Sequence, residues 1–303
     1  MDRPGAPRNL PVSDEGDAIG EVLPVREVTP SRKSAIRRAL LLFSASGGLV
    51  WFLRLAVFVV FIAGWEVSVR RQLVSEFFVS RPSAVWTFLI EFFSSGDFVR
   101  HGATTAVEVL VGFAAGSAAG IVSGVLIARS PLLESVVGPY LAALNALPRI
   151  ALAPMFILWF GIGPASKIYL AISLVFFVLL LNTQAGIRSV DSDLLTTAHV
   201  LGATEMQMFT KVILPAAVPA VFAGLRLGAI YSLLGVVVGE MMAAIRGLGQ
   251  QLSYFSGSFL PAGVFGILFI LAVFAVLMDK LMQQAENRLL RWQFAESKRT
   301  RRQ

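Results

Sequence analysis

The chain has 303 residues, of which 56% are hydrophobic and 15% are charged, and its mean hydropathy is +0.73. A composition this apolar excludes an ordinary soluble domain and predicts an all-α, polytopic membrane protein. The formal net charge of +7 does not indicate nucleic-acid binding, because the basic residues gather at the two termini beside apolar stretches, as membrane topology requires.

Residues 1–45 mix proline, glycine and charges of both signs without any periodicity, which predicts a disordered cytoplasmic tail. The first apolar run begins some forty residues into the chain and no small-residue cleavage pattern follows it, so we do not expect a signal peptide. Residues 46–290 are expected to form the membrane domain, and residues 291–303 a basic cytoplasmic tail. The basic residues just before the first span can lie against lipid headgroups; they are Arg32, Lys33, Arg37 and Arg38.

Six stretches are long enough to cross a bilayer, since a helix needs about 20 apolar residues for this. They are Leu49–Val69, Thr104–Ala128, Leu132–Phe160, Ile168–Gly186, Ala216–Met242 and Pro261–Leu277. In the third stretch, Pro148 and Pro154 are expected to interrupt the helix, because proline removes a backbone donor. The aromatic-rich segment 77–98 is expected to be a loop at the outer membrane interface.

The second predicted span carries a glycine at every fourth position. Small residues at this spacing allow two helix backbones to approach closely, which is how helices associate in a membrane. The glycines are Gly112, Gly116, Gly120 and Gly124. They predict helix packing, either within one protomer or at a moving interface between protomers.

Charged residues inside predicted spans need a reason to be there, because a charge at mid-membrane is costly. Arg149 follows Pro148 at the predicted break, and it either lines the route of an anion or caps the broken helix. Arg226, Glu108 and Glu240 are expected to form structural ion pairs, although Glu240 is also a candidate for the translocation pathway with Pro148 and Arg149. His101, expected in an outer loop, and His199 have no supporting metal ligands nearby.

The segment from Asp191 to Pro215 is polar and lies between two apolar runs, and it predicts two short helices joined by a hinge. Ser192 or Asp193 is expected to cap the first helix, and Gly202 to end it in a left-handed conformation. Thr204 and Gln207 have the spacing of a capping box for the second helix. Leu214 and Pro215 are expected to end that helix.

The same segment resembles the cytoplasmic coupling loop of ABC importer permeases, whose pattern is E-A-A, three residues, G, nine residues, I-x-L-P. The matching residues here are Thr196, Thr197, Ala198, Gly202, Val212, Leu214 and Pro215, so that two threonines replace the leading Glu and the first Ala. By this resemblance Thr196, Ala198, Gly202, Leu214 and Pro215, together with Met206 and Phe209 of the second helix, contact an ATPase. Met206 and Phe209 are the side chains expected to enter a groove on it.

Further segments resemble the permease subfamily that imports nitrate, taurine and alkanesulfonates. They are PSAVW at 82–86, LAPMFILWFGIG at 152–163, LLLNTQAGIRSVD at 179–191 and AGLRLG at 223–228. The resemblance implies a type I permease fold, a homodimer in the membrane lipid of the bacterial inner membrane, a separate ATPase subunit that binds ATP and Mg, and an extracytoplasmic solute-binding protein. No cofactor on this chain is implied.

Orientation follows from the basic residues. The six-span layout places most of the 26 Lys and Arg residues on the inner side if both termini are cytoplasmic, and it places the 191–215 segment on that side too. The chain has no cysteine and no G-x-x-x-x-G-K-[ST] stretch, so thiolate metal sites and a phosphate-binding loop are excluded. An ion-coupled secondary transporter remains the alternative, although we find no internal repeat. A membrane enzyme would need a catalytic constellation, which the sequence lacks.

Overall fold

The computed structural model describes residues 47–289, and the two predicted tails and the basic residues before the first span lie outside that range. The chain divides into two compact units at Val60 and Phe61. The described part of the first unit is the beginning of helix α2 (Gly47–Arg70), most of whose side chains in this unit are exposed. The end of α2 and all later elements belong to the second unit.

The described residues of the second unit form helices joined by short loops and contain no strand. Its helices are α3 (Pro82–Ser94), α4 (Asp97–Arg129), α5 (Pro131–Ala146), α6 (Ala153–Phe160), α7 (Pro164–Arg188), α8 (Ser192–Val200), α9 (Glu205–Gln207), α10 (Leu214–Met242), α11 (Leu248–Gly257) and α12 (Pro261–Leu289). A 3-10 turn, η1 (Arg149–Leu152), precedes α6, and a π-helical segment, η2 (Met208–Ile213), joins α9 to α10.

Five helices within residues 47–289 are long and apolar enough to cross a membrane, and α5 with α6 makes a sixth if this bent pair is one span. The bend between its two parts is 78°. It begins at Leu147 and Pro148, as the sequence predicts. Pro154 does not break the helix, because it lies in the first turn of α6, where no intrahelical donor is needed.

One further expectation is corrected. The segment 77–98 contains a true helix, α3, which starts with Pro82 in its first turn and buries Leu89 and Phe92. The helix that holds the last predicted span runs on past Leu277 to Leu289, as a helical tail after that span requires. Hydropathy alone leaves both stretches outside the spans.

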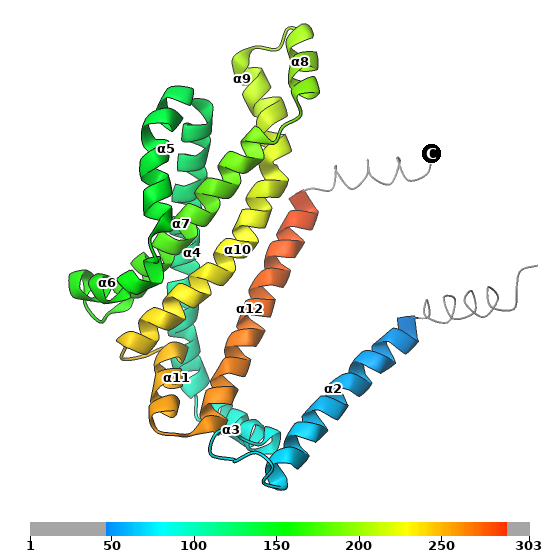
Figure 1. Ribbon diagram of the computed structural model, residues 1–303, viewed down its shortest axis with the longest axis vertical. Helices are drawn as coiled ribbons and strands as arrows, with labels where there is room; N and C mark the ends of the chain where they lie inside the picture. The colour runs from blue at the N-terminus through cyan, green and yellow to red at the C-terminus, as the bar shows by residue number, and fades with distance from the viewer. Residues whose placement is uncertain (1–46, 290–303) are drawn as a thin grey trace, which may run out of the picture. The chain divides into compact units, whose positions relative to one another are not determined.

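Helices α4, α7 and α10 form the centre of the second unit, with α7 packed between the other two (Figure 1). The glycines of α4 face α7: a Cβ on Gly120 would lie 2.5 Å from the Phe176 carbonyl oxygen, and one on Gly116 would lie 2.8 Å from the Val175 Cβ. Gly112 and Gly124 approach α7 in the same way. The stripe therefore serves a contact within one protomer.

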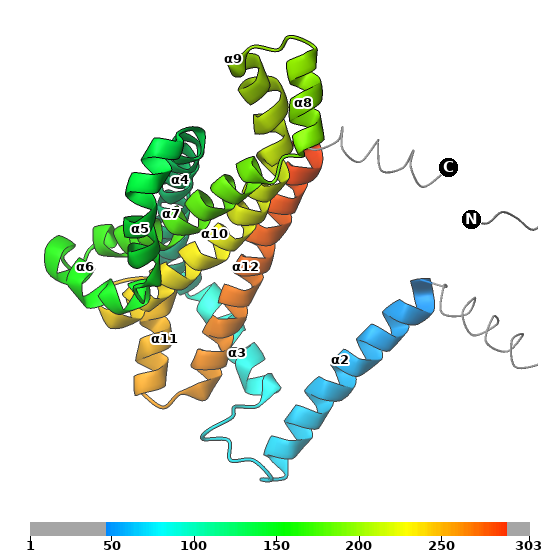
Figure 2. The ribbon, with the colours of Figure 1, turned by 45° about the horizontal axis from the view of Figure 1, so that its top comes forward.

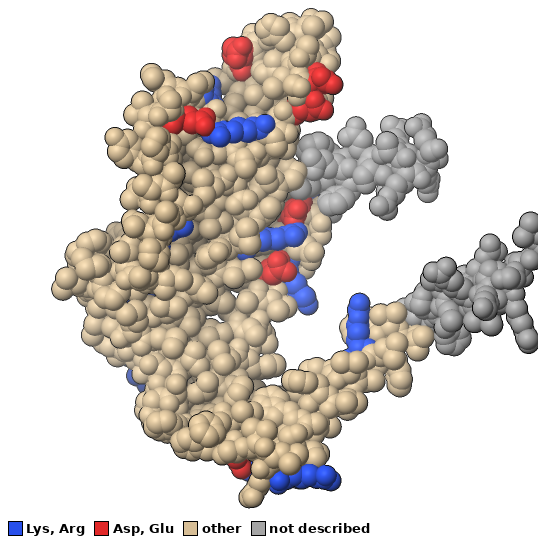
Figure 3. All heavy atoms as spheres, viewed as in Figure 1, with Lys and Arg blue, Asp and Glu red and all other residues tan. Residues whose placement is uncertain are grey.

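Charged side chains are thinly spread over the face of the molecule shown in Figure 3, and acidic ones gather beside α8 and α9. The helices of the second unit expose many large apolar side chains. These include Leu158 and Trp159 of α6 and Ile230 of α10. Exposed apolar helix faces are expected of a chain whose solvent is lipid.

Candidate functional site

Helices α8 and α9 project beyond the ends of α7 and α10, at the end remote from α11 (Figures 1 and 2). Asp191 is the residue that caps α8, since its carboxylate accepts a hydrogen bond from the Asp193 backbone N–H at 2.8 Å. The sequence suggested Ser192 or Asp193 instead. The boundary differs by one residue because several adjacent side chains are suitable caps.

The hinge after α8 has the geometry that the sequence predicts. Gly202 has a φ of 78°, a left-handed conformation in which a Cβ is strained. Two residues later the Thr204 hydroxyl accepts from the Gln207 N–H, and the Gln207 side chain accepts from the Thr204 N–H, completing a capping box. The hinge angle is thus specified by local chemistry.

The second short helix does not end at Pro215. Helix α9 passes through the π-helical segment η2 directly into α10, with Pro215 in the first turn of α10. A π segment has i→i+5 hydrogen bonds, so the local register differs from that of an α-helix just where proline lacks its donor. Helix α9, the segment η2 and helix α10 therefore form one continuous helical stretch, Glu205–Met242.

Apolar side chains are exposed around the hinge. Val200 and Leu201 are each 81% exposed and Met206 is 59% exposed. Phe209 is half-buried instead, because the Arg129 guanidinium of α4 lies over its ring at 4.4 Å from the centroid. The exposed patch is thus Val200, Leu201 and Met206; Val200 and Leu201 directly precede the hinge glycine, and the sequence did not single them out as contact residues.

The remaining coupling candidates lie in α8 and at the start of α10. Thr196 is exposed and its hydroxyl donates to the Ser192 carbonyl within α8, at 2.9 Å. Ala198 is half-buried, Leu214 is exposed and Pro215 is half-buried.

Arg149 lies at the break of the bent pair. Its guanidinium donates to the Asn145 side-chain oxygen at 2.8 Å and to the Ser173 carbonyl of α7 at 3.3 Å, and it lies 4.5 Å from the centroid of the Phe177 ring. Within residues 47–289 no carboxylate lies within ion-pair distance of it. A half-buried positive charge therefore remains uncompensated next to the exposed Pro148.

Glu240 is enclosed at the opposite end of the molecule from the hinge. It is 1% exposed, and its two carboxylate oxygens accept from the Thr105 hydroxyl and from the Gly249 N–H, both at 2.7 Å. The Thr105 hydroxyl also accepts the Leu248 N–H at 2.8 Å. Side chains of α4 and α10 thus satisfy the free backbone donors at the start of α11.

His101 completes this capping of α11. The sequence placed it in a loop, but it lies in α4, is buried, and accepts the Gly247 N–H on Nδ1 at 3.1 Å. Gly247 and Gly249 must be glycines, since an added Cβ would lie 2.2 Å from the Glu240 carboxylate and 2.4 Å from the Val237 carbonyl, respectively. We call His101, Thr105, Glu240 and the N-terminus of α11 the α11 anchor.

The predicted ion pairs are only partly present. Arg226 pairs with Glu286 of α12, as expected for a structural role. Glu240 is held by a hydroxyl and a backbone N–H, and Glu108 makes no ion pair with a described residue. No group of three potential metal ligands is found among the described residues.

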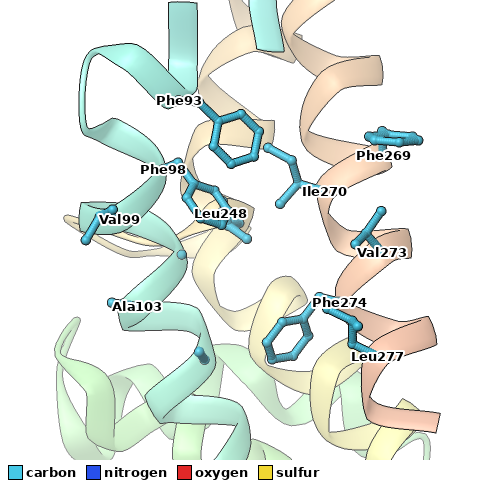
Figure 4. Close-up of a pocket in the computed structure, with 12 residues that line it drawn as sticks. Phe93, Phe98, Val99, Ala103, Leu248, Phe269, Ile270, Val273, Phe274 and Leu277 are labelled. Carbon is cyan, nitrogen blue, oxygen red and sulfur yellow. The ribbon is translucent and has the colours of Figure 1, made fainter. Parts of the chain in front are cut away.

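Two cavities lie near these elements. One, of about 360 Å³, is lined by residues of α4, the start of α7 and the segment between α10 and α11, including Glu108, Lys167 and Arg246. The other, of about 430 Å³, is almost wholly apolar and is lined by α3, α4 and α12; Phe98 and Phe274 point into it (Figure 4). Only the first offers charged groups to a ligand.

Known proteins with similar sequences and folds place this geometry in a family. The chain is 34% identical to a Bacillus subtilis (strain 168) permease named for aliphatic sulfonates transport, SsuC, covering 80% of this chain and 88% of the relative. It is 32% identical to the riboflavin transport system permease protein RibX of Chloroflexus aurantiacus (90% and 98%). It is 29% identical to the taurine transport system permease protein TauC of Escherichia coli (79% and 89%).

Among solved structures, the fold is similar to the methionine ABC transporter MetNI, with a TM-score of 0.57 at 20% identity over 64% of this chain and 96% of that one. An amino acid ABC transporter gives a TM-score of 0.52 at 19% identity, covering 66% and 96%. These likenesses support the all-α permease fold. Residues 116–291 match the family described as the binding-protein-dependent transport system inner membrane component. The chain belongs to this family, and it is a permease subunit of an ABC importer, in which ATP is hydrolysed by a separate subunit.

Proposed function

We propose that the chain works as a homodimer that carries a small anionic solute across the bacterial inner membrane, driven by a partner ATPase that binds ATP and Mg. The observation that carries this proposal is the exposed apolar patch of Val200, Leu201 and Met206 on a hinge fixed by Gly202 and Thr204. An apolar helix end presented in this way fits a groove on another protein. An extracytoplasmic binding protein supplies the solute on the other side of the membrane.

Coupling requires that movement of the patch reaches the membrane helices. The continuous path from α9 through η2 to α10 offers this, because a rigid helix transmits a displacement along its length. Phe209, held under Arg129 of α4, ties the same segment to a second helix. In this mechanism closure of the two ATPases draws the two patches together and switches the cavity between inward-facing and outward-facing states.

The translocation pathway is proposed to pass Pro148 and Arg149 at the bend between α5 and α6. An uncompensated, half-buried guanidinium favours an anion and opposes a cation. Glu240 is proposed to contribute by fixing the wall of the pathway through α11. A solute such as a sulfonate, taurine or nitrate satisfies this charge requirement, and two of the relatives are named for sulfonate and taurine transport.

The homodimer is proposed to form through the faces of α5 and α6. Helix α5 buries no residue and α6 buries only Ala153 within the described unit, although both are apolar. The 78° bend leaves Arg149 at this uncovered side, so that a second copy would enclose it. Both termini and the hinge are proposed to lie on the cytoplasmic side, because this orientation puts most of the basic residues there.

The test is co-purification of the ATPase with Gly202→Val permease, together with solute uptake in reconstituted vesicles. Valine at a φ of 78° is strained by about 1 to 2 kcal/mol, so α9 should leave the hinge at a wrong angle. ATPase recovery and uptake should both fall at least about tenfold, while permease yield stays unchanged.

Gly257→Val is the matched control, because Gly257 has open space around it and does not have a positive φ. This variant should retain the ATPase. Full recovery of the complex and normal uptake by Gly202→Val would show that the hinge is an ordinary connector. Uptake that continues without any ATPase would favour an ion-coupled transporter.

A further inference from the structure

Helix α3 has three different faces. Trp86, Ile90 and Phe93 recur at helical spacing and are 64%, 55% and 51% exposed, whereas Leu89 and Phe92 are buried in the hydrophobic core. The polar residues form a separate exposed stripe: Ser83, Thr87, Glu91 and Ser94. A helix that packs on protein with one face and presents one apolar and one polar stripe fits the boundary between protein, lipid and water. The exposed Trp86 agrees with this level, because tryptophan is enriched at membrane interfaces.

The apolar cavity of about 430 Å³ begins beside α3, and we call it the apolar groove. Phe93, near the end of α3, and Phe98, at the start of α4, line it at this end (Figure 4). Its other wall is α12, whose Gly266 lies against the Phe88 ring of α3. The mouth of the groove is therefore at the level of the interface that α3 marks.

The length of the groove matches an acyl chain of one leaflet. The lining residues run away from α3 on both walls, from Phe98 to Ala106 in α4 and from Phe269 to Leu277 in α12. Eight rises of about 1.5 Å give each wall a length of about 12 Å. The hydrocarbon core of a bilayer is about 30 Å thick, so each leaflet contributes about 15 Å. A chain that enters at the level of α3 stays between the walls for most of the depth of its leaflet.

The walls are suited to hydrocarbon. Every side chain that lines the groove is apolar, so water finds no hydrogen-bond partner there. Val99 and Val273, one on each wall, are exposed, so the groove is open toward the surrounding lipid. Gly102 keeps it wide: the nearest neighbours of an added Cβ would be atoms of the Phe98 ring, from 3.5 Å, which is an ordinary contact distance.

The first turn of α4 supplies a charge for a headgroup. Arg100 directly follows the groove residue Val99 and is exposed, and no described carboxylate lies within ion-pair distance of it. Asp97, in the same turn, accepts the Ser95 hydroxyl at 3.0 Å instead. A guanidinium binds phosphate oxygens well, because its donors are arranged as a planar fork.

We propose that the apolar groove is a binding site for one phospholipid, with an acyl chain between α4 and α12 and the phosphate at Arg100. With both termini in the cytoplasm, this lipid belongs to the outer leaflet. The site involves neither the hinge nor Arg149, so it is independent of the solute that the permease carries.

The experiment uses the full-length permease with its ATPase in lipid nanodiscs that contain a trace of phosphatidylglycerol with a diazirine in the middle of one acyl chain. After illumination, mass spectrometry compares the label on residues 98–106 and 269–277 with the label on the exposed residues of α2. The groove should carry at least about tenfold more label per residue, equivalent to a tenfold preference over a plain lipid-facing helix. Equal labelling would mean bulk lipid only, and no label in the groove would mean that a protein helix covers it; either result overturns the proposal.

Three variants locate the effect. Gly102→Leu fills the groove and should lower its label at least about tenfold, while the label on α2 stays unchanged. Gly64→Leu is the matched control, because it adds the same side chain to α2 where no atom lies within 4 Å of the added Cβ. Arg100→Gln should lower labelling by phosphatidylglycerol but not by a diacylglycerol probe with the same chains, which has no phosphate.

ATPase recovery in the same samples shows that each variant is folded. An unchanged groove label in folded Gly102→Leu would overturn the acyl-chain site. An unchanged phosphatidylglycerol signal in Arg100→Gln would overturn the assignment of the phosphate.

Discussion

The Thr105 hydroxyl donates to Glu240 Oε1 at 2.7 Å, joining α4 to α10 across 135 positions of the chain. The same oxygen accepts the Leu248 N–H, so one side chain connects three helices. Thr105→Val is expected to leave two buried polar groups without their partner, at a cost on the order of 1 to 3 kcal/mol each. Thermal unfolding of the detergent-purified permease measures this loss.

Thr104→Val is the matched control for this prediction. The Thr104 hydroxyl bonds only to the Arg100 carbonyl within its own helix, so its removal should change the unfolding temperature little. Equal stability of the two variants would mean that the α11 anchor contributes nothing beyond packing.

The glycine stripe of α4 predicts a steric effect. Gly120→Ala places a Cβ 2.5 Å from the Phe176 carbonyl oxygen, and backbone at that distance must move. Overpacking of this kind costs about 1 to 3 kcal/mol. The fraction of permease that remains monodisperse after heating should fall.

Gly138→Ala in α5 gives the comparison, because no atom lies within 4 Å of the position of its added Cβ. Alanine there should be neutral or stabilise the helix by roughly 0.5 to 1 kcal/mol. If both alanine variants behave alike, close approach of α4 and α7 is not important for stability.

Arg149→Gln is expected to retain folded protein and to reduce anion uptake about tenfold, equivalent to about 1.4 kcal/mol. Glutamine keeps an N–H donor at the position where arginine donates to Asn145 and to the Ser173 carbonyl, but it carries no charge. Arg149→Lys should retain part of the uptake, since it keeps the charge and loses the stacking on Phe177. Uptake assays in proteoliposomes compare the three proteins, and unchanged uptake by Arg149→Gln would remove this residue from the pathway.

Topology can be tested by single cysteines, because the chain has none of its own. Gly202, Ser95 and Ser256 are all exposed positions. A membrane-impermeant thiol reagent added to intact cells should label cysteine introduced at 95 and 256 but not at 202. Labelling at 202 together with protection at 95 would invert the proposed orientation.

Local signals in the sequence were sufficient for much of the fold. Long apolar runs indicate membrane helices, Gly202 with the Thr204–Gln207 capping box determines the hinge, and Pro148 ends a helix. Each of these effects involves residues within one or two helical turns of one another, so the spacing of residues in the sequence is enough to predict it. The family resemblance rests on the same kind of local pattern, and the comparisons confirm it.

The continuity of α9 with α10 and the contacts of the α11 anchor could be established only from the tertiary structure. The continuation of α9 through the π-helical segment η2 into α10, with Pro215 in the first turn of α10, is seen only in the structure. The α11 anchor joins His101 and Thr105 to residues some 140 positions later, and its geometry depends on the rotation of α4 against α10. Side-chain periodicity marks which face of a helix is apolar, but the partner that satisfies a buried polar group is fixed only when separate helices meet.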